Sequence, residues 1–129
     1  MHSVGIDLIE VERIQAAIAR HGDRFLARVF TENELQYCRG HAHQLAARFA
    51  AKEAVSKALG VGIQYRDGVC WREIEIVSDE RGKPALQLTG AAARRAAQLN
   101  LRNFAISLSH TREHAIAMVI AERMEVNCR

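Results

Sequence analysis

The chain has 129 residues, of which 49% are hydrophobic and 26% charged, and its formal net charge is +3. This length and composition are typical of one globular domain, so we expect a single domain over residues 1–129 and exclude two independent cores. The chain contains no apolar run of 18 residues, and it does not open with a basic segment followed by an apolar one. The sequence therefore predicts neither a transmembrane helix nor a signal peptide.

The first quarter of the chain predicts a strand followed by a helix. The β-branched residues Val4 and Ile6 indicate a strand that begins near residue 2 and ends at Asp7. Apolar residues then recur at helical spacing over 10–20, which predicts an amphipathic helix. The segment 21–23 contains a glycine and ends or bends that helix.

Further helices are expected before the middle of the chain. A short one should follow Asp23, which could cap it. Thr31 and Glu34 have the spacing of a capping box, in which each side chain bonds a backbone amide at the start of a helix. The longest helix covers about 43–59 and is dominated by strong helix formers. Gly60 is well suited to end it.

The second half of the chain predicts two hairpins that flank a helix. In chain order, the expected segments are a strand at 71–77, a turn at 79–84, a strand at 85–89, an Ala-rich helix at 90–100, and strands at 104–109 and 114–120. Strands that cluster after helices favour an α+β fold with an antiparallel sheet over a parallel βαβ arrangement.

Cysteine and alanine usage bear on the compartment and on the kind of site. Cys38, Cys70 and Cys128 are scattered and lack Cys-x-x-Cys spacing. We therefore expect reduced thiols in a cytoplasmic protein, with no disulfide framework and no zinc site. Alanine is abundant whereas aromatic residues make up only 5%. Small side chains bury little area each, so a site between subunits is an alternative to a deep pocket within one.

Asp7 is the first candidate for chemistry. A carboxylate at the end of a buried strand is costly unless it is hydrogen-bonded or binds a cation. The ordinary interpretation is a cap for the helix that begins near Glu10, and residue type alone favours it. A metal ligand is the alternative.

The second candidate is the segment 48–60. Arg48 and Lys52 stand four residues apart, as do Glu53 and Lys57, so each pair shares one face of a helix. The ordinary interpretation is surface ion pairs on a solvated helix. Apolar residues surround much of this helix, however, which favours a position for Glu53 near a buried boundary.

Together these residues describe a phosphate site. Mg²⁺ prefers a few carboxylates together with phosphate oxygens, so Asp7 and Glu53 could supply two of its ligands. Lys57, one turn from Glu53, could neutralise a phosphate held by the same ion. The expected strand end at 107–111 adds His110, which could contact a phosphate or simply line the turn.

Basic residues mark the first helical region. At spacings of seven, four and four, they are Arg13, Arg20, Arg24 and Arg28. They could form an ordinary solvated surface or a docking face for an acidic helix. Nucleic acid is a weaker alternative, because the chain is only mildly basic and has no aromatic residues interleaved with the arginines.

Motifs across nearly the whole chain resemble those of the 4'-phosphopantetheinyl transferases, and in particular the short holo-[acyl-carrier-protein] synthases. They are VGIDLIEVERI at 4–14, RFAAKEAVSKALG at 48–60, RGKP at 81–84 and SLSHT at 107–111. The first two motifs together make the resemblance specific.

The resemblance implies a complete biochemical role. It implies an α+β fold and a homotrimer whose active sites lie at the subunit interfaces. It also implies Mg²⁺-dependent transfer of the phosphopantetheine arm of coenzyme A to a serine of acyl carrier protein, with release of 3',5'-ADP, in support of fatty acid biosynthesis. The expected partners are thus coenzyme A and acyl carrier protein, without nucleic acid or membrane.

The resemblance also assigns roles to residues. Asp7 and Glu53 match the metal-binding acids and Lys57 matches the lysine that contacts the coenzyme phosphates, so these three are the expected catalytic residues. With Lys57, the expected coenzyme-binding residues are Arg48, Gly60, Lys83, Pro84, His110 and Thr111, of which the last four lie in segments that approach from a neighbouring subunit. The expected carrier-docking residues are Arg13, Arg20, Arg24 and Arg28.

Other functions stay open on the residues alone. A different Mg²⁺-dependent phosphoryl-transfer enzyme or nucleotide hydrolase would use the same two acids without a basic docking helix. A non-catalytic adaptor would bind acidic helices through the arginines and leave Asp7, Glu53 and Lys57 unexplained. For the transferase itself, Glu53 and a water on the metal are both candidates for the base that accepts the serine proton.

Overall fold

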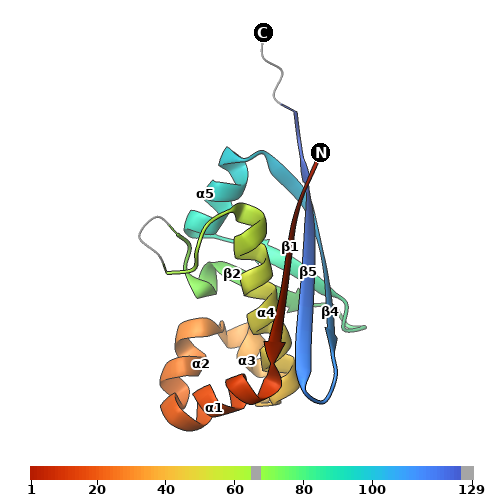
Figure 1. The fold of residues 1–129 in the computed structure, drawn as a ribbon. Helices are drawn as coiled ribbons and strands as arrows, with labels where there is room; N and C mark the ends of the chain where they lie inside the picture. The colour runs from red at the N-terminus through yellow and green to blue at the C-terminus, as the bar shows by residue number, and fades with distance from the viewer. Residues whose placement is uncertain (65–67, 126–129) are drawn as a thin grey trace.

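A three-stranded antiparallel sheet and one long helix form the centre of the fold (Figure 1). The computed structural model describes residues 1–64 and 68–125. The strands are β1 (His2–Glu10), β5 (His114–Arg123) and β4 (Leu101–His110), in that spatial order. The helix is α4 (Ala42–Leu59), which packs mainly against β1 and β5. The predicted α+β fold with an antiparallel sheet is confirmed.

Side chains alternate along β1, as the two-residue period of a strand requires. Gly5 and Ile9 are buried toward α4, whereas Val4, Ile6 and Leu8 are exposed on the opposite face. The described helices all lie on the α4 side of the sheet (Figure 1). The spatial order of the strands also places β1 at an edge of this sheet.

Short helices gather around the N-terminal end of α4 (Figure 1). They are α1 (Val11–His21), α2 (Asp23–Val29) and α3 (Glu32–Cys38). The predicted capping box opens α3: Thr31 Oγ1 accepts from the Glu34 amide at 3.2 Å, and Glu34 Oε1 accepts from the Thr31 amide at 2.9 Å. This local prediction is confirmed.

A second hairpin and a helix complete the fold. Strands β2 (Ile74–Ser78) and β3 (Pro84–Leu88) pair antiparallel, and α5 (Gly90–Gln98) follows them. A 3₁₀ turn, η1 (Trp71–Glu73), precedes β2, so the strand predicted over 71–77 begins three residues late. Glu73 explains the difference, because its carboxylate accepts from the backbone amides of Cys70 and Ala91, each at 2.6 Å.

The α4 helix approaches β1 very closely. Half of its buried residues are alanines, which let a helix backbone come near its neighbour. Gly5 faces it from β1, and a Cβ atom there would lie 1.8 Å from the carbonyl oxygen of Ala54. Backbone therefore meets backbone at this point, two residues before Asp7.

Asp7 lies inside β1 and not at its end. Leu8 and Ile9 continue the ladder with β5 as far as Glu10, which then occupies the N-cap position of α1. The prediction that Asp7 ends the strand and caps a helix is therefore wrong. The predicted Asp23 cap is also wrong, because that residue is the first of α2 and makes no side-chain capping bond.

Two of the three cysteines lie in the described part of the chain. Cys38 is buried and Cys70 is exposed, and both are free thiols, whereas Cys128 lies outside the described residues. Burial raises the pKa of the Cys38 thiol to about 11. Within residues 1–64 and 68–125, no helix is long and apolar enough to span a membrane.

Candidate active site

Asp7 and Lys57 meet where the free edge of β1 passes the C-terminal half of α4. Lys57 Nζ lies 3.1 Å from Asp7 Oδ1 and donates a second hydrogen bond, of 2.9 Å, to the carbonyl oxygen of Ile6. The Lys57 side chain is 55% exposed and that of Asp7 is 19% exposed. The ammonium group is thus anchored on the strand edge but open to a ligand from solvent.

Glu53 lies one helical turn before Lys57, on the same face of α4. Its pKa is raised above its usual range, chiefly by partial burial and further by the negative charge of Asp7, while Lys57 acts in the opposite direction. The two carboxylates are therefore close enough to repel each other. The expectation that Glu53 lies near a buried boundary is consistent with this position.

These two acids fit a divalent cation. A cation between them would relieve their repulsion, and two carboxylates leave coordination positions for phosphate oxygens and water, as Mg²⁺ prefers. Among the described residues, no group of three or more acidic, histidine or cysteine side chains is arranged to hold a metal ion. An ion at Asp7 and Glu53 would need further ligands, such as phosphate oxygens and water.

Arg48 and Lys52 are buried, which contradicts the interpretation of this helix as carrying surface ion pairs. The Arg48 guanidinium donates to Gln44 Oε1 at 2.7 Å and to Ser78 Oγ at 2.9 Å, and it lies 4.6 Å from the centre of the Tyr37 ring. Its Nε atom is buried and has no hydrogen-bond partner among the described residues.

The turn that carries Lys83 and Pro84 lies near Arg48. Pro84 is paired with Ser78 across the β2–β3 hairpin, and Ser78 is bound to Arg48. Gly60, by contrast, ends α4 in the left-handed conformation, with φ 69°. Its predicted role as the residue that ends α4 is confirmed, and its role toward a coenzyme stays a prediction.

His110 and Thr111 lie at the turn between β4 and β5, beside the start of α4. The rings of His110 and His43 are 5.3 Å apart, and His43 Nε2 lies 3.0 Å from the carbonyl oxygen of Arg112. A hollow at this corner is lined by His41, His43, Gln44, His110, Thr111 and Arg112. Sequence reasoning missed His41, His43, Gln44 and Arg112, because this corner depends on how α4 meets the sheet.

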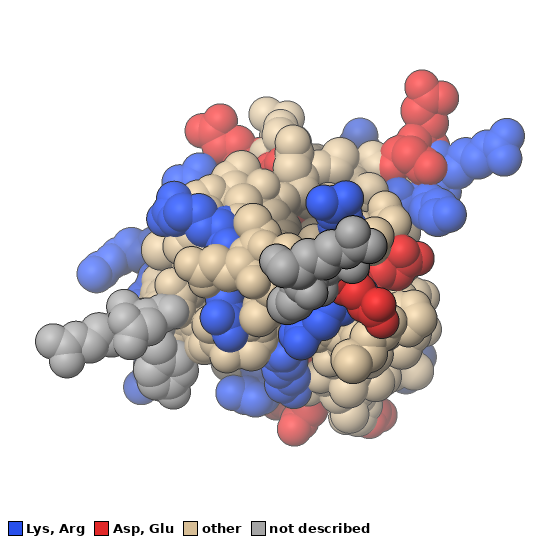
Figure 2. All heavy atoms as spheres, turned by 90° about the horizontal axis from the view of Figure 1, so that it is seen from above, with Lys and Arg blue, Asp and Glu red and all other residues tan. Residues whose placement is uncertain are grey.

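The four arginines predicted to dock the carrier are all exposed, two on α1 and two on α2. Arg24 and Arg28 line a hollow of about 340 Å³ together with His21 and Phe25. Arg28 also donates to Gln64 Oε1. Figure 2 shows a different part of the molecule, the end from which the N-terminus emerges, where basic and acidic side chains are interspersed.

The predicted site residues thus form separate groups on one chain. Asp7, Glu53 and Lys57 come together at the β1 edge. Arg48 and Glu53 are five residues apart on α4, which places them about 140° apart around the helix. Sequence reasoning missed the buried partner of Lys52, which is Glu34 at 2.8 Å.

Comparison with known proteins identifies the family of the chain. Residues 3–119 match the model of the 4'-phosphopantetheinyl transferase superfamily. The holo-[acyl-carrier-protein] synthase of Herpetosiphon aurantiacus is 52% identical over 120 residues, covering 90% of this chain and 94% of that protein. The Vibrio cholerae protein of the same name is 46% identical, covering 93% and 96%.

The solved structures that match this chain are also holo-[acyl-carrier-protein] synthases. Helicobacter pylori holo-[acyl-carrier-protein] synthase in complex with coenzyme A superposes with a TM-score of 0.83 at 30% identity, covering 92% of this chain and 99% of that one. The Bacillus anthracis synthase in complex with CoA (3',5'-ADP) has a TM-score of 0.75 at 36% identity, covering 95% and 96%. The chain therefore belongs to the 4'-phosphopantetheinyl transferase superfamily, among the holo-[acyl-carrier-protein] synthases.

Proposed function

We propose that this chain transfers the 4'-phosphopantetheine group of coenzyme A to a serine of apo acyl carrier protein and releases 3',5'-ADP. The observation that carries the proposal is the convergence of Asp7, Glu53 and Lys57 at the β1 edge, in a chain of this family. Two acids and one ammonium group are suited to a pyrophosphate and a divalent cation.

Asp7 and Glu53 would hold Mg²⁺, and Lys57 would bind the coenzyme phosphates. When bound, the ion would offset negative charge on the phosphoryl oxygens and so favour nucleophilic attack at the phosphorus. Lys57 is prepared for this role, because Asp7 and the Ile6 carbonyl hold its ammonium group on the strand edge. Its exposure leaves it free to form a further bond to a phosphate oxygen.

The reaction requires one nucleophile, one base and charge stabilisation. The serine hydroxyl attacks the phosphorus that bears pantetheine, a new P–O bond forms, and the bond to the 3',5'-ADP oxygen breaks. Glu53 is our candidate to accept the serine proton, because it lies on the same face of α4 as Lys57 and close to Asp7. Lys57 offsets the negative charge that develops on the 5'-phosphate of the leaving 3',5'-ADP.

The rest of the coenzyme would be bound by the other predicted residues. The Arg48 Nε atom has no hydrogen-bond partner within residues 1–64 and 68–125, so it has a hydrogen bond left to donate. Lys83 and Pro84 lie near it through Ser78, and His110 and Thr111 line the hollow at the β4–β5 turn. Arg48 and Glu53 lie about 140° apart around α4, which favours a coenzyme that bridges two copies of the chain.

A homotrimer with active sites between subunits is the assembly we propose. Val4, Ile6 and Leu8 are 55%, 52% and 60% exposed, and they pair across β1 and β5 with Ile120, Met118 and Ile116. Such a contiguous apolar surface is typical of an interface between proteins. It lies on the face of the edge strand β1 opposite to Asp7, so a second copy seated there would reach Asp7 around the β1 edge. Sedimentation equilibrium that gives a monomer mass would reject the trimer.

Transfer is tested by weighing an apo acyl carrier protein after incubation with this protein, coenzyme A and Mg²⁺. The expected result is the addition of one phosphopantetheine group, absent when the carrier serine is replaced by alanine. No mass change, with a carrier that another transferase can modify, would contradict the proposal. Release of 3',5'-ADP without a carrier would instead indicate a hydrolase, and carrier binding without transfer would indicate an adaptor.

A further inference from the structure

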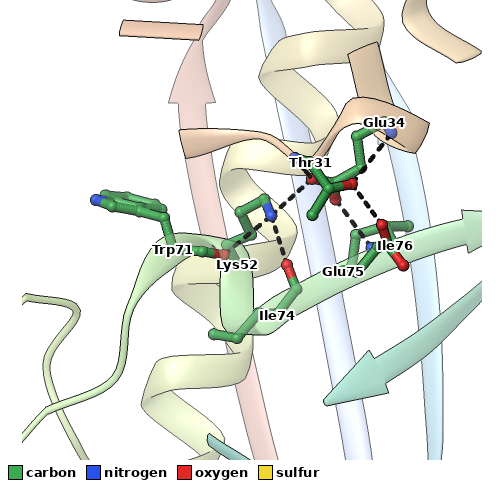
Figure 3. A network of polar contacts seen from close by, with 7 residues as sticks. All are labelled: Thr31, Glu34, Lys52, Trp71, Ile74, Glu75 and Ile76. Carbon is green, nitrogen blue, oxygen red and sulfur yellow. Dashed lines mark hydrogen bonds and ion pairs between the residues drawn. The ribbon is translucent and has the colours of Figure 1, made fainter. Parts of the chain in front are cut away.

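Lys52 is a fully buried lysine on a different face of α4 from Glu53 and Lys57. Figure 3 shows the contacts of its side chain. Its Nζ atom lies 2.8 Å from Glu34 Oε1 and donates hydrogen bonds to the carbonyl oxygens of Trp71, at 3.1 Å, and Ile74. An ammonium group has three donors, so all of them are used. Lys52 thus ties α4 to α3, η1 and β2 at one point.

Glu34 extends the same network (Figure 3). Its Oε1 atom also accepts from the Thr31 amide at 2.9 Å, and its Oε2 atom accepts from the Ile76 amide at 2.9 Å. Thr31 Oγ1 in turn donates to Glu75. The carboxylate therefore belongs at once to the capping box of α3, to β2 and to the ion pair.

Stability alone does not account for such a pair. Removing two charges from water is costly, and well-packed apolar residues of similar volume often serve equally well or better. An ion pair also restricts the relative orientation of the elements that it joins, because its hydrogen bonds require particular distances and angles. An alanine-rich helix needs such directional contacts to fix its rotation about its own axis. Small apolar side chains interlock little, and the hydrophobic effect is not directional.

The rotation of α4 about its own axis decides the geometry of the site. Glu53 follows Lys52 in the chain, about 100° further around the helix. With side chains extending about 5–6 Å from the helix axis, a roll of roughly 20° would move the Glu53 carboxylate by about 2 Å. Displacements of about 1 Å can cost a reaction roughly a hundredfold. The 3.1 Å contact between Lys57 and Asp7 depends on the same roll.

We infer that Lys52 and Glu34 are positioning residues, which fix the rotation of α4 so that Glu53 and Lys57 face Asp7. This inference rests on the proposed role of those three residues. It predicts that the ion pair matters to metal binding and turnover beyond its effect on folding, although neither Lys52 nor Glu34 touches the substrate.

The test compares three variants with the unaltered protein. Lys52→Met removes the charge at similar length and leaves the Glu34 carboxylate buried without a partner. Lys52→Met/Glu34→Gln is neutral and keeps an acceptor for the Thr31 and Ile76 amides, so it should recover much of the melting temperature that the single change loses. Leu101→Ala, a core truncation on β4, is the control for lost stability alone.

Each protein is assayed well below its melting temperature for kcat, for the KM of coenzyme A, and for Mn²⁺ affinity with coenzyme A present, by electron paramagnetic resonance. In the double variant we expect kcat and Mn²⁺ affinity to fall by at least roughly tenfold, whereas Leu101→Ala keeps both. A folded double variant with both values within about twofold of the unaltered protein would overturn the inference. If the unaltered protein transfers nothing, the proposed function fails, and the Mn²⁺ affinities still decide the inference.

Discussion

Lys57 Nζ lies 3.1 Å from Asp7 Oδ1, although fifty residues separate the two along the chain. The contact joins the edge strand of the sheet to the long helix, and Glu53 lies on the same helix face. One carboxylate comes from a strand, the other from a helix, and an ammonium group reaches over the strand edge between them. The site is therefore as well ordered as the packing of α4 on β1.

Replacing Lys57 by glutamine should separate catalysis from stability. The side chain is half exposed, so its ion pair contributes about 1 kcal/mol or less to the free energy of unfolding. In the proposed mechanism its charge faces the reacting phosphates, and losing such a group lowers kcat by about 10²–10³. Steady-state transfer kinetics and a melting curve test both expectations, with Arg102→Gln as the control. A kcat close to that of the unaltered protein would remove Lys57 from the mechanism.

Gly5→Ala should damage the site through the backbone. The new Cβ would lie 1.8 Å from the Ala54 carbonyl oxygen, so β1 and α4 must move apart. Overpacking of this kind costs at least about 2 kcal/mol of unfolding free energy. Because Asp7 lies on the displaced strand, we also expect a lower affinity for Mg²⁺ and a lower kcat. Urea unfolding and transfer rates measure these effects, and His2→Ala on the same strand should change neither.

Glu53 should make stability depend on pH in a direction opposite to that of most paired acids. Its pKa is raised in the folded protein, so it binds its proton more tightly folded than unfolded. Its contribution to stability is therefore complete below pH 4.5, the usual pKa of a glutamate, and is lost as the pH rises through the raised value. Glu53→Gln should thus melt at a higher temperature than the unaltered protein at pH 7 without metal, and the difference should shrink toward pH 4.5. A lower melting temperature at pH 7 would contradict this environment for Glu53.

Arg24→Glu should weaken recognition of the carrier without affecting chemistry. Arg24 is exposed on α2, beside Arg28 and Phe25 around a shared hollow. Reversing a charge at the rim of an interface chiefly slows association and changes its salt dependence. We expect the KM for carrier protein to rise by about tenfold with kcat little changed. Arg102→Glu on β4 carries the same charge reversal away from these helices, and an equal effect there would reject a specific docking face.

The fold was largely predictable because most of its signals are local. The Thr31–Glu34 capping box and the Gly60 helix end are both present as the sequence indicates. Asp7 was misjudged from local signals, since capping aspartates are common and the ladder with β5 is a long-range contact. Its proposed role came from the resemblance of its motif and not from its type.

Lys52 could not have been placed from the sequence. Lysine is almost never fully buried, so an exposed position was the natural expectation. The partner that allows its burial is Glu34, whose capping role was evident while its second oxygen and its reach to Ile76 were not. The Glu34 carboxylate serves both the local capping box and the long-range contacts with Lys52 and Ile76, and only the capping box has a sequence signal.

The central claim is that Asp7, Glu53 and Lys57 form one site at which the phosphates of coenzyme A react. The most direct test is the early rate of mass gain of apo acyl carrier protein, compared among the unaltered protein, Asp7→Asn and Glu53→Gln. We predict one phosphopantetheine per carrier with the unaltered protein, none after EDTA treatment, and a rate at least about a hundredfold lower in both folded variants. Near-normal rates in both variants would contradict the account.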